Sequence, residues 1–165
     1  MICTFYSYKG GVGRSMALAN VADVLARRGR RILMIDFDLE APGLEQYFPI
    51  NLEGVRRHTG LLDLLLGYKQ AMSVARTADA PFRHVDNFIC PVYERLPGGG
   101  RLDLMPAGQR QDREQLARYA LNLRSFDWQD FYFNWQGELF FEWLRRELTA
   151  PRGDSAARYD LVLVD

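Results

Sequence analysis

Residues 7–15 read SYKGGVGRS, and most of the sequence can be interpreted outward from this stretch. Its glycines stand between two cations, Lys9 and Arg14, and a serine follows. Backbone N–H groups of a glycine-rich turn at a helix N-terminus form a cradle for an anion, and the helix dipole favours the negative charge. Glycines let the backbone curl around a phosphate because they carry no Cβ. The glycines in question are Gly10, Gly11 and Gly13. We therefore predict a phosphate-binding loop over residues 9–15.

The segments on either side of this loop favour a βαβ unit. Residues 2–6, ICTFY, are typical of a short buried parallel strand. Residues 14–29 predict a helix that Gly29 ends in a left-handed conformation. Its expected apolar face consists of Leu18, Val21, Ala22 and Leu25. Residues 31–38, RILMIDFD, predict a second apolar strand that closes on acidic residues. A strand, helix and strand in this order predict a parallel sheet with a right-handed crossover.

The rest of the chain adds further helices and strands to this unit. We expect helices over 60–72 and 113–123, strands over 85–93, 101–108 and 159–165, and a turn at 97–100. The fold class is therefore α/β, with a mostly parallel sheet flanked by helices. We expect residues 1–165 to form a single domain, and only 149–158 resembles a flexible connection. Ligand-binding loops normally follow the carboxyl end of such a strand, so we expect this domain to be the front part of a longer protein.

Composition restricts the classes of function. Nearly half of the 165 residues are hydrophobic, and the formal net charge is zero, so bulk charge indicates neither a nucleic-acid nor an anionic-membrane partner. No apolar run approaches the ~20 residues of a transmembrane segment, and the N-terminus lacks the pattern of a secretory signal. Cys3 and Cys90 each stand in an apolar run. We expect both cysteines to be buried and unpaired, which fits a reducing cytoplasm.

Acidic residues follow two of the predicted strands. Asp36 and Asp38 come at the end of the strand over 31–38, and Asp165 ends the strand YDLVLVD. Carboxylates at this end of a parallel sheet lie where such sheets bind ligands. We predict a Mg²⁺ site formed by Ser15, Asp36 and Asp165, with Asp36 and Asp38 also able to orient an attacking water. The alternative for Asp36 and Asp38 is a solvated acidic turn.

Residues 126–143 hold nine of the 21 aromatic residues of the chain. Large rings on a helix that covers a sheet most often belong to the core, and we expect this for most of them. The helix that follows is expected to bury one side, formed by Leu139, Phe140, Trp143, Leu144 and Leu148. The alternative is that some of the rings form an anchor surface for a partner. His58 and His84 have no partners at metal-ligand spacing, and we assign them no role.

Taken together, these motifs resemble the MinD/ParA-like ATPases, which are P-loop NTPases of the SIMIBI type. KGGVGRS looks like their deviant Walker A motif, DFDLEAPG is similar to their aspartate-bearing second motif, RLDLMPAG to their Leu-Pro-Ala strand, and YDLVLVD to their Walker B strand. The resemblance implies binding of ATP or ADP with Mg²⁺. The implied nucleotide-binding residues are Lys9, Gly10, Gly11, Val12, Gly13, Arg14, Ser15 and Met16. It also implies a homodimer that forms on ATP binding, in which Lys9 reaches the phosphates of the partner's nucleotide and takes part in catalysis.

Arg14 departs from the family pattern, which has lysine at this position. The match is closest to a bacterial branch that carries arginine there and in which this domain opens longer, regulatory chains. An arginine fork suits bidentate phosphate contact but is bulkier than the lysine point charge. We therefore expect nucleotide binding with slow hydrolysis. In the competing arrangement Arg14 points into solvent or pairs with an acidic neighbour, and Lys9 and the backbone hold the phosphates.

Other functions of the same fold remain open from the sequence. Bacterial tyrosine kinases share the phosphate loop and a second motif that DLEAP resembles, but they normally need a tyrosine-rich tail as substrate, and the eight tyrosines of this chain are scattered. A module that binds nucleotide without hydrolysing it, and passes this state to an unknown downstream domain or partner, is a further alternative. Iron–sulfur carriers fit poorly, because Cys3 and Cys90 are badly placed for an interface cluster.

Overall fold

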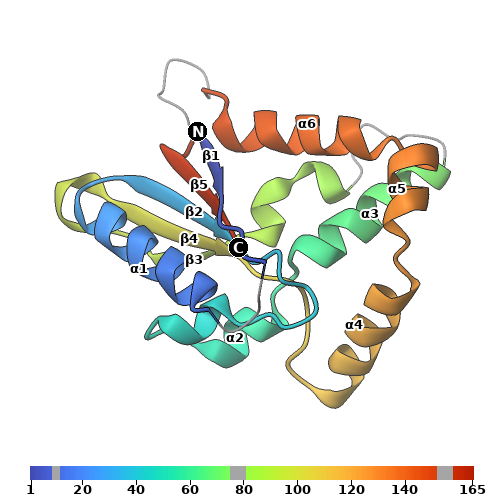
Figure 1. The fold of residues 1–165 in the computed structure, drawn as a ribbon, viewed down its shortest axis with the longest axis horizontal. Helices are drawn as coiled ribbons and strands as arrows, with labels where there is room; N and C mark the ends of the chain where they lie inside the picture. The colour runs from blue at the N-terminus through green and yellow to red at the C-terminus, as the bar shows by residue number, and fades with distance from the viewer. Residues whose placement is uncertain (9–11, 75–80, 152–157) are drawn as a thin grey trace.

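The computed structural model describes residues 1–8, 12–74, 81–151 and 158–165, which form one sheet with helices on both sides (Figure 1). The strands are β1 (Ile2–Thr4), β2 (Arg31–Ile35), β3 (Cys90–Tyr93), β4 (Arg101–Met105) and β5 (Leu161–Val164). The helices are α1 (Arg14–Arg27), α2 (Leu52–Arg57), α3 (Leu61–Ser73), α4 (Arg113–Ser125), α5 (Trp128–Asn134) and α6 (Gly137–Thr149). Short 3₁₀ turns span Leu44–Tyr47, Pro81–Arg83, Val85–Phe88 and Pro97–Gly99. The α/β class predicted from the sequence is therefore confirmed.

The strands lie in the order β1-β5-β2-β4-β3. The first four are parallel to one another, and β3 runs antiparallel to β4. The register aligns Ile35 at the end of β2 with Val164 of β5 and Met105 of β4. The carboxyl ends of these three strands therefore meet at one edge of the sheet.

Alternation along the strands sends side chains into two separate cores. In β2, Ile32 and Met34 join a cluster that includes Leu18 of α1, whereas Leu33 and Ile35 join a cluster on the opposite face. That second cluster contains residues of α3 and α6, such as Leu61 and Phe140. Figure 1 shows α1 on one side of the sheet and α6 on the other. The central strands are thus covered on both faces, as a parallel sheet requires.

Helix α1 begins and ends close to its predicted limits. Gly29 follows it with φ 84°, which confirms the predicted left-handed end. The buried face differs from the prediction, because Val21 is 39% exposed while the buried residues are Leu18, Ala19, Ala22 and Ala26. Small alanines face the sheet, and they let the helix approach it closely.

Other expectations about elements were wrong in part. Strand β1 is parallel as predicted, but it is an edge strand whose residues are exposed, and Cys3 is therefore exposed as well. Residues 85–93 begin as a 3₁₀ turn, and only Cys90–Tyr93 forms a strand. Leu139 of α6 is exposed, because Phe140, Leu144 and Leu148 occupy the face that the helix buries. Most of the connection predicted at 149–158 lies outside the described residues.

The aromatic stretch belongs mostly to the core. Phe126, Phe131 and Phe140 are buried, and their rings pack against one another at centroid distances of 5.3 Å and 5.6 Å. The partly buried members of the stretch that pack against the same cluster are Trp128, Trp135, Phe141 and Trp143. Tyr132 and Phe133 are exposed. The core interpretation is thus confirmed for seven of the nine rings.

Candidate functional site

Acidic side chains gather where parallel strands β2 and β5 end. The backbone N–H of Asp165 donates to the carbonyl of Ile35 at 3.0 Å, and that of Asp36 donates to the carbonyl of Met105 at 3.0 Å. Strand β2 stops at Ile35, so Asp36 and Asp38 stand in the irregular segment beyond the strand. The structure therefore brings the segments that carry all three predicted carboxylates to the same edge of the sheet.

The described end of the glycine-rich loop, residues 12–15, leads into α1. Gly13 caps the helix in a left-handed conformation with φ 80° and ψ 22°, which favours glycine, and its carbonyl accepts the first helical hydrogen bond, from Ala17. The predicted loop residues Lys9, Gly10 and Gly11 lie outside the described part of the chain. Of the remaining predicted loop residues, Ser15 is partly buried, whereas Val12 and Met16 are exposed.

Arg14 connects the loop to the carboxylates. Its Nε donates to Oδ1 of Asp165 at 2.6 Å, and its Nη2 donates to Oδ2 of Asp38 at 2.9 Å. The hydrogen bond that Arg14 donates to Asp165 raises the pKa of Arg14 most, so the guanidinium stays charged. Of the two arrangements considered from the sequence, the structure has Arg14 paired with acidic neighbours.

The third predicted carboxylate, Asp36, is fully buried. Its Oδ2 accepts hydrogen bonds from the backbone N–H groups of Gly43 and Leu44, at 3.0 Å and 3.2 Å. Its Oδ1 is buried without a hydrogen-bond partner among the described residues. Burial raises the pKa of Asp36 to about 7, and the hydrogen bonds from the backbone offset only part of this effect. Asp36 is thus not the solvated side chain of an acidic turn.

The segment after Asp36 is held by a buried ion network that the sequence analysis missed. Glu45, which is fully buried, accepts hydrogen bonds through Oε1 from Arg110 at 2.7 Å and from Arg56 at 3.2 Å. Tyr119 of α4 donates its hydroxyl to the carbonyl of Leu39 at 2.7 Å. Arg110 lies 65 positions from Glu45, and neither arginine belongs to a motif with it, so only the tertiary structure identifies this network.

The donor set at this edge fits a magnesium ion. Ser15, Asp36 and Asp165 offer the oxygen ligands that Mg²⁺ prefers, and the unpartnered Oδ1 of Asp36 is a free acceptor. Among the described residues, no three His, Cys, Asp or Glu side chains are close enough to hold a metal by themselves. A cation here would therefore take phosphate oxygens or waters as further ligands, as Mg²⁺ usually does.

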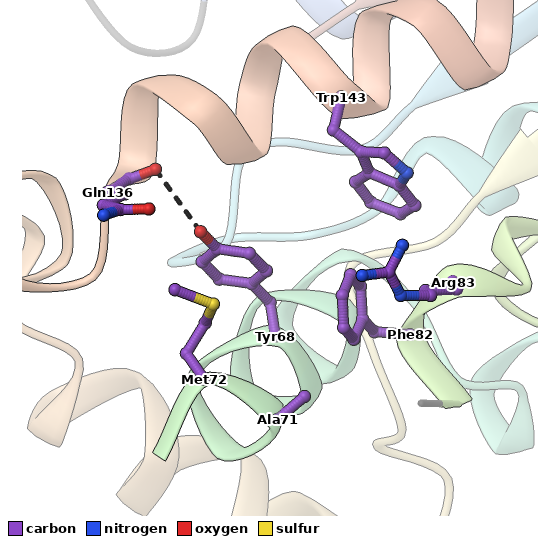
Figure 2. A pocket seen from close by; sticks show the side chains of 7 residues that line it. All are labelled: Tyr68, Ala71, Met72, Phe82, Arg83, Gln136 and Trp143. Atoms are coloured by element: carbon purple, nitrogen blue, oxygen red, sulfur yellow. Dashed lines mark hydrogen bonds between the residues drawn. The ribbon is translucent and has the colours of Figure 1, made fainter. Parts of the chain in front are cut away.

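A cavity of about 200 Å³ lies away from these residues, next to α3 and α6 (Figure 2). Its walls include Tyr68, Phe82 and Trp143, whose rings pack edge to face, and Arg83 lies over the ring of Phe82. Of the predicted site residues that the structure describes, none lines this cavity. The site predicted from the sequence and this aromatic cavity are therefore separate features.

Comparison with known proteins adds to this geometry. The model of the family described as "CobQ/CobB/MinD/ParA nucleotide binding domain" matches residues 3–127. EpsB of Ralstonia solanacearum, which is named as a candidate tyrosine-protein kinase, is 42% identical over 71 residues. The tyrosine-protein kinase ptk of Acinetobacter johnsonii is 34% identical over 70 residues. These segments cover 43% and 42% of the chain but only 9% of each relative.

Two further findings concern the structure. No solved structure gave a significant match to the chain. In the described part of the chain, none of the helices is both long and apolar enough to span a bilayer.

Proposed function

The chain belongs to the CobQ/CobB/MinD/ParA nucleotide-binding domain family, and from this premise we propose that it binds ATP and ADP at the loop 9–15. The observation that carries the proposal is the position of the described end of this loop, residues 12–15. It leads into α1 through Gly13, and Arg14 at the start of the helix contacts carboxylates at the ends of neighbouring strands. Helix N-terminus, cation and carboxylates together offer what a metal-bound polyphosphate needs.

Within this proposal, Ser15, Asp36 and Asp165 hold a Mg²⁺ ion that accompanies the nucleotide. When bound, the ion neutralises charge on the phosphates and supplies a Lewis acid. Gly10, Gly11, Val12, Gly13 and Met16 form the wall of the phosphate site, whereas Lys9 binds the nucleotide held by a second copy of the chain. Asp36 and Asp38 orient the attacking water. The free acceptor on Asp36 and the convergence of strand ends support these assignments.

We propose further that nucleotide binding switches the chain between monomer and homodimer, with Lys9 reaching the partner's phosphates. Support comes from the surface around the loop, where Tyr6, Tyr8, Val12 and Met16 are all exposed. Aromatic residues and Met are enriched in protein interfaces, and a second copy would cover this apolar group. In this proposal residues 1–165 act as one nucleotide-binding domain of a longer protein, which fits the much longer relatives.

Hydrolysis in this proposal is slow. Arginine in place of the usual lysine grips the phosphates in the ground state as strongly as in the transition state, which favours binding over turnover. We place the activity in the cytoplasm, because Cys3 and Cys90 are free thiols, as a reducing compartment maintains them.

Tyrosine phosphorylation is a second candidate function. It rests on the similarity of 71 residues to a protein named as a candidate tyrosine kinase. Tyr8 is 91% exposed next to the predicted loop, so it is an accessible acceptor. Incubation with Mg-ATP, followed by mass spectrometry of Tyr6 and Tyr8, tests this candidate. Phosphate release without phosphotyrosine favours the ATPase instead.

The primary proposal is tested by thermal unfolding with Mg-ADP and Mg-ATP. A ligand that binds only the folded state raises the melting temperature by mass action. We expect a rise at millimolar nucleotide for the wild type, and a smaller rise for Ser15→Ala. Ser73→Ala is the matched control, because the Ser73 hydroxyl donates to the carbonyl of Gln70 at the end of α3 and belongs to none of the proposed site residues. An unchanged melting temperature of the wild type would refute nucleotide binding.

A further inference from the structure

The most specific feature of the site is the pair of carboxylates that share one guanidinium. Asp38 and Asp165 come from different strand ends, yet both contact Arg14, at 2.9 Å and 2.6 Å. The side chain of Asp165 is only 2% exposed, and Arg14 donates to its Oδ1 at 2.6 Å, so little of this carboxylate is open to solvent. Asp165 is also one of the two carboxylates proposed above to hold Mg²⁺.

The same guanidinium is the cation that the loop offers to phosphates. Arginine has five N–H donors in a rigid plane, and the structure uses the Nε edge for Asp165 and Nη2 for Asp38. One positive charge cannot balance two carboxylates and a polyphosphate together. If phosphates take the guanidinium, the two carboxylates lose their cation and repel the phosphates until another cation enters.

Arg27, near the other end of α1, forms an ion pair that does not link separate segments of the chain. Arg27 of α1 pairs with Asp23 four residues earlier, and 57% of its side chain is exposed. Such a pair joins one turn of the helix to the next. Arg14 instead joins the first turn of α1 to the segments after β2 and β5, over 24 and 151 positions in the sequence. Its pairing therefore affects the residues that surround the ligand.

We propose that Arg14 is an internal cation that keeps a divalent metal off Asp38 and Asp165 until nucleotide phosphates draw the guanidinium away. Metal and nucleotide then enter together, and the nucleotide-free protein has low affinity for the metal. This inference rests on the proposed nucleotide site, and it assigns to Arg14 a positioning role in addition to phosphate contact. Removing the guanidinium frees both carboxylates for the metal.

The test is a titration with Mn²⁺ in the absence of nucleotide, in which electron paramagnetic resonance measures the concentration of free ion. We expect Arg14→Gln to bind Mn²⁺ about ten-fold more tightly than the wild type, since a competing charge-assisted hydrogen bond has been removed. Arg14→Lys keeps a positive charge beside the carboxylates, so its affinity should stay within about three-fold of the wild type. Arg27→Gln is the matched control on the same helix and should not change the affinity.

Equal Mn²⁺ affinities of Arg14→Gln and the wild type would overturn the proposal. A merely structural role would alter the melting temperature without changing metal affinity, so this readout separates the two roles. If Arg14→Gln does not fold, the wild type can be tested by the NMR signal of the Arg14 Nε–H. Addition of metal-free ADP should shift this signal, and an unchanged signal in the ADP-bound protein would refute the exchange.

This experiment also distinguishes failure of the inference from failure of the proposed function. The Mn²⁺ titration contains no nucleotide, so its outcome does not depend on nucleotide binding. If ADP does not bind the wild type while Arg14→Gln gains Mn²⁺ affinity, the nucleotide site is wrong and the carboxylates are still shielded by Arg14. If ADP binds and the Mn²⁺ affinities are equal, only the shielding role is wrong.

Discussion

Asp36 is the residue at which burial and hydrogen bonding compete most directly. Its carboxyl is fully buried, and burial raises its pKa from 3.8 to about 7. Between these two pH values the folded protein holds a proton that the unfolded chain releases. The free energy of unfolding therefore falls as the pH rises from about 4 to 7, and this contribution is constant above that range.

Substitution of Asp36 by Asn should remove this dependence. The amide oxygen of Asn can still accept from Gly43 and Leu44, and the side chain carries no charge to bury. We expect Asp36→Asn to be more stable than the wild type at pH 7 and to differ less from it at pH 5. For one proton the difference changes by at most about 1.4 kcal/mol per pH unit. Urea unfolding in EDTA at several pH values measures it, and parallel curves for the two proteins would contradict the expectation.

Arg110 and Glu45 show that a buried charge depends on a partner of opposite sign. Arg110 has 7% of its side chain exposed and is the nearer of the two arginine partners of the buried Glu45. Removal of one partner from a buried pair leaves a charge with inadequate compensation. Stability should therefore depend strongly on Arg110.

We expect Arg110→Ala to lower the free energy of unfolding by about 3 kcal/mol. Arg118→Ala is the matched control, because Arg118 pairs with Glu114 on an exposed face of α4, and such pairs contribute less than about 1 kcal/mol. Chemical denaturation of both variants measures the difference. Similar losses in the two variants would show that the buried pair of Arg110 and Glu45 contributes no more stability than the exposed pair of Arg118 and Glu114.

At the scale of elements, the sequence predicted the features that local patterns of residues determine. The parallel strands, the helix after the loop and its end at Gly29 follow from apolar runs and glycine conformation, and the structure has them. The exposed position of β1 could not be predicted, because an apolar run such as ICTFY is the same in a central and in an edge strand. The order of strands depends on tertiary contacts that no local pattern encodes.

The sequence also predicted part, but not all, of the candidate site. Glycine spacing and acidic residues after strands identified Arg14, Asp36, Asp38 and Asp165. The pairing of Arg14 with the two aspartates required the three-dimensional distances, since the sequence left two arrangements open. The burial of Asp36 likewise depends on the segment that folds over it through Gly43 and Leu44.

The junction between β4 and α3 provides a prediction about elements. A Cβ on Gly60 would lie 2.0 Å from the carbonyl oxygen of Pro106, and the N–H of Leu61 donates to that same oxygen at 2.8 Å. We expect Gly60→Ala to lower the free energy of unfolding by about 1–3 kcal/mol, because the backbone must move apart. Gly67→Ala, in the middle of α3, is the control, since its Cβ would meet only an ordinary contact at 3.6 Å from Phe82.

The control variant should behave in the opposite direction. Glycine inside a helix is less favourable than alanine by about 1 kcal/mol, so Gly67→Ala should be neutral or stabilising. Thermal unfolding of the two variants compares the effect of a substitution at the start of α3 with that of a substitution in its middle. A harmless Gly60→Ala would mean that α3 does not require the close approach to Pro106.

At the scale of the whole molecule, the proposed switch predicts an oligomeric change. Lys9→Ala should retain nucleotide affinity and lose the ATP-induced dimer, because the proposed contact of Lys9 is with the partner's phosphates. Light scattering with a slowly hydrolysed ATP analogue measures this change. Arg28→Ala, at the far end of α1 from the loop, is the control and should dimerise normally. A Lys9→Ala variant that dimerises like the wild type would contradict the contact.

Calorimetric titration with Mg-ADP tests the central claim of nucleotide binding at the loop most directly. The account predicts one ADP bound per wild-type chain and a loss of at least about ten-fold in affinity for Gly13→Leu, because φ 80° at Gly13 is a conformation that a leucine rarely adopts. Circular dichroism should verify that the variant remains folded. The absence of ADP binding to the wild type, or equal affinities of the folded variant and the wild type, would contradict the account.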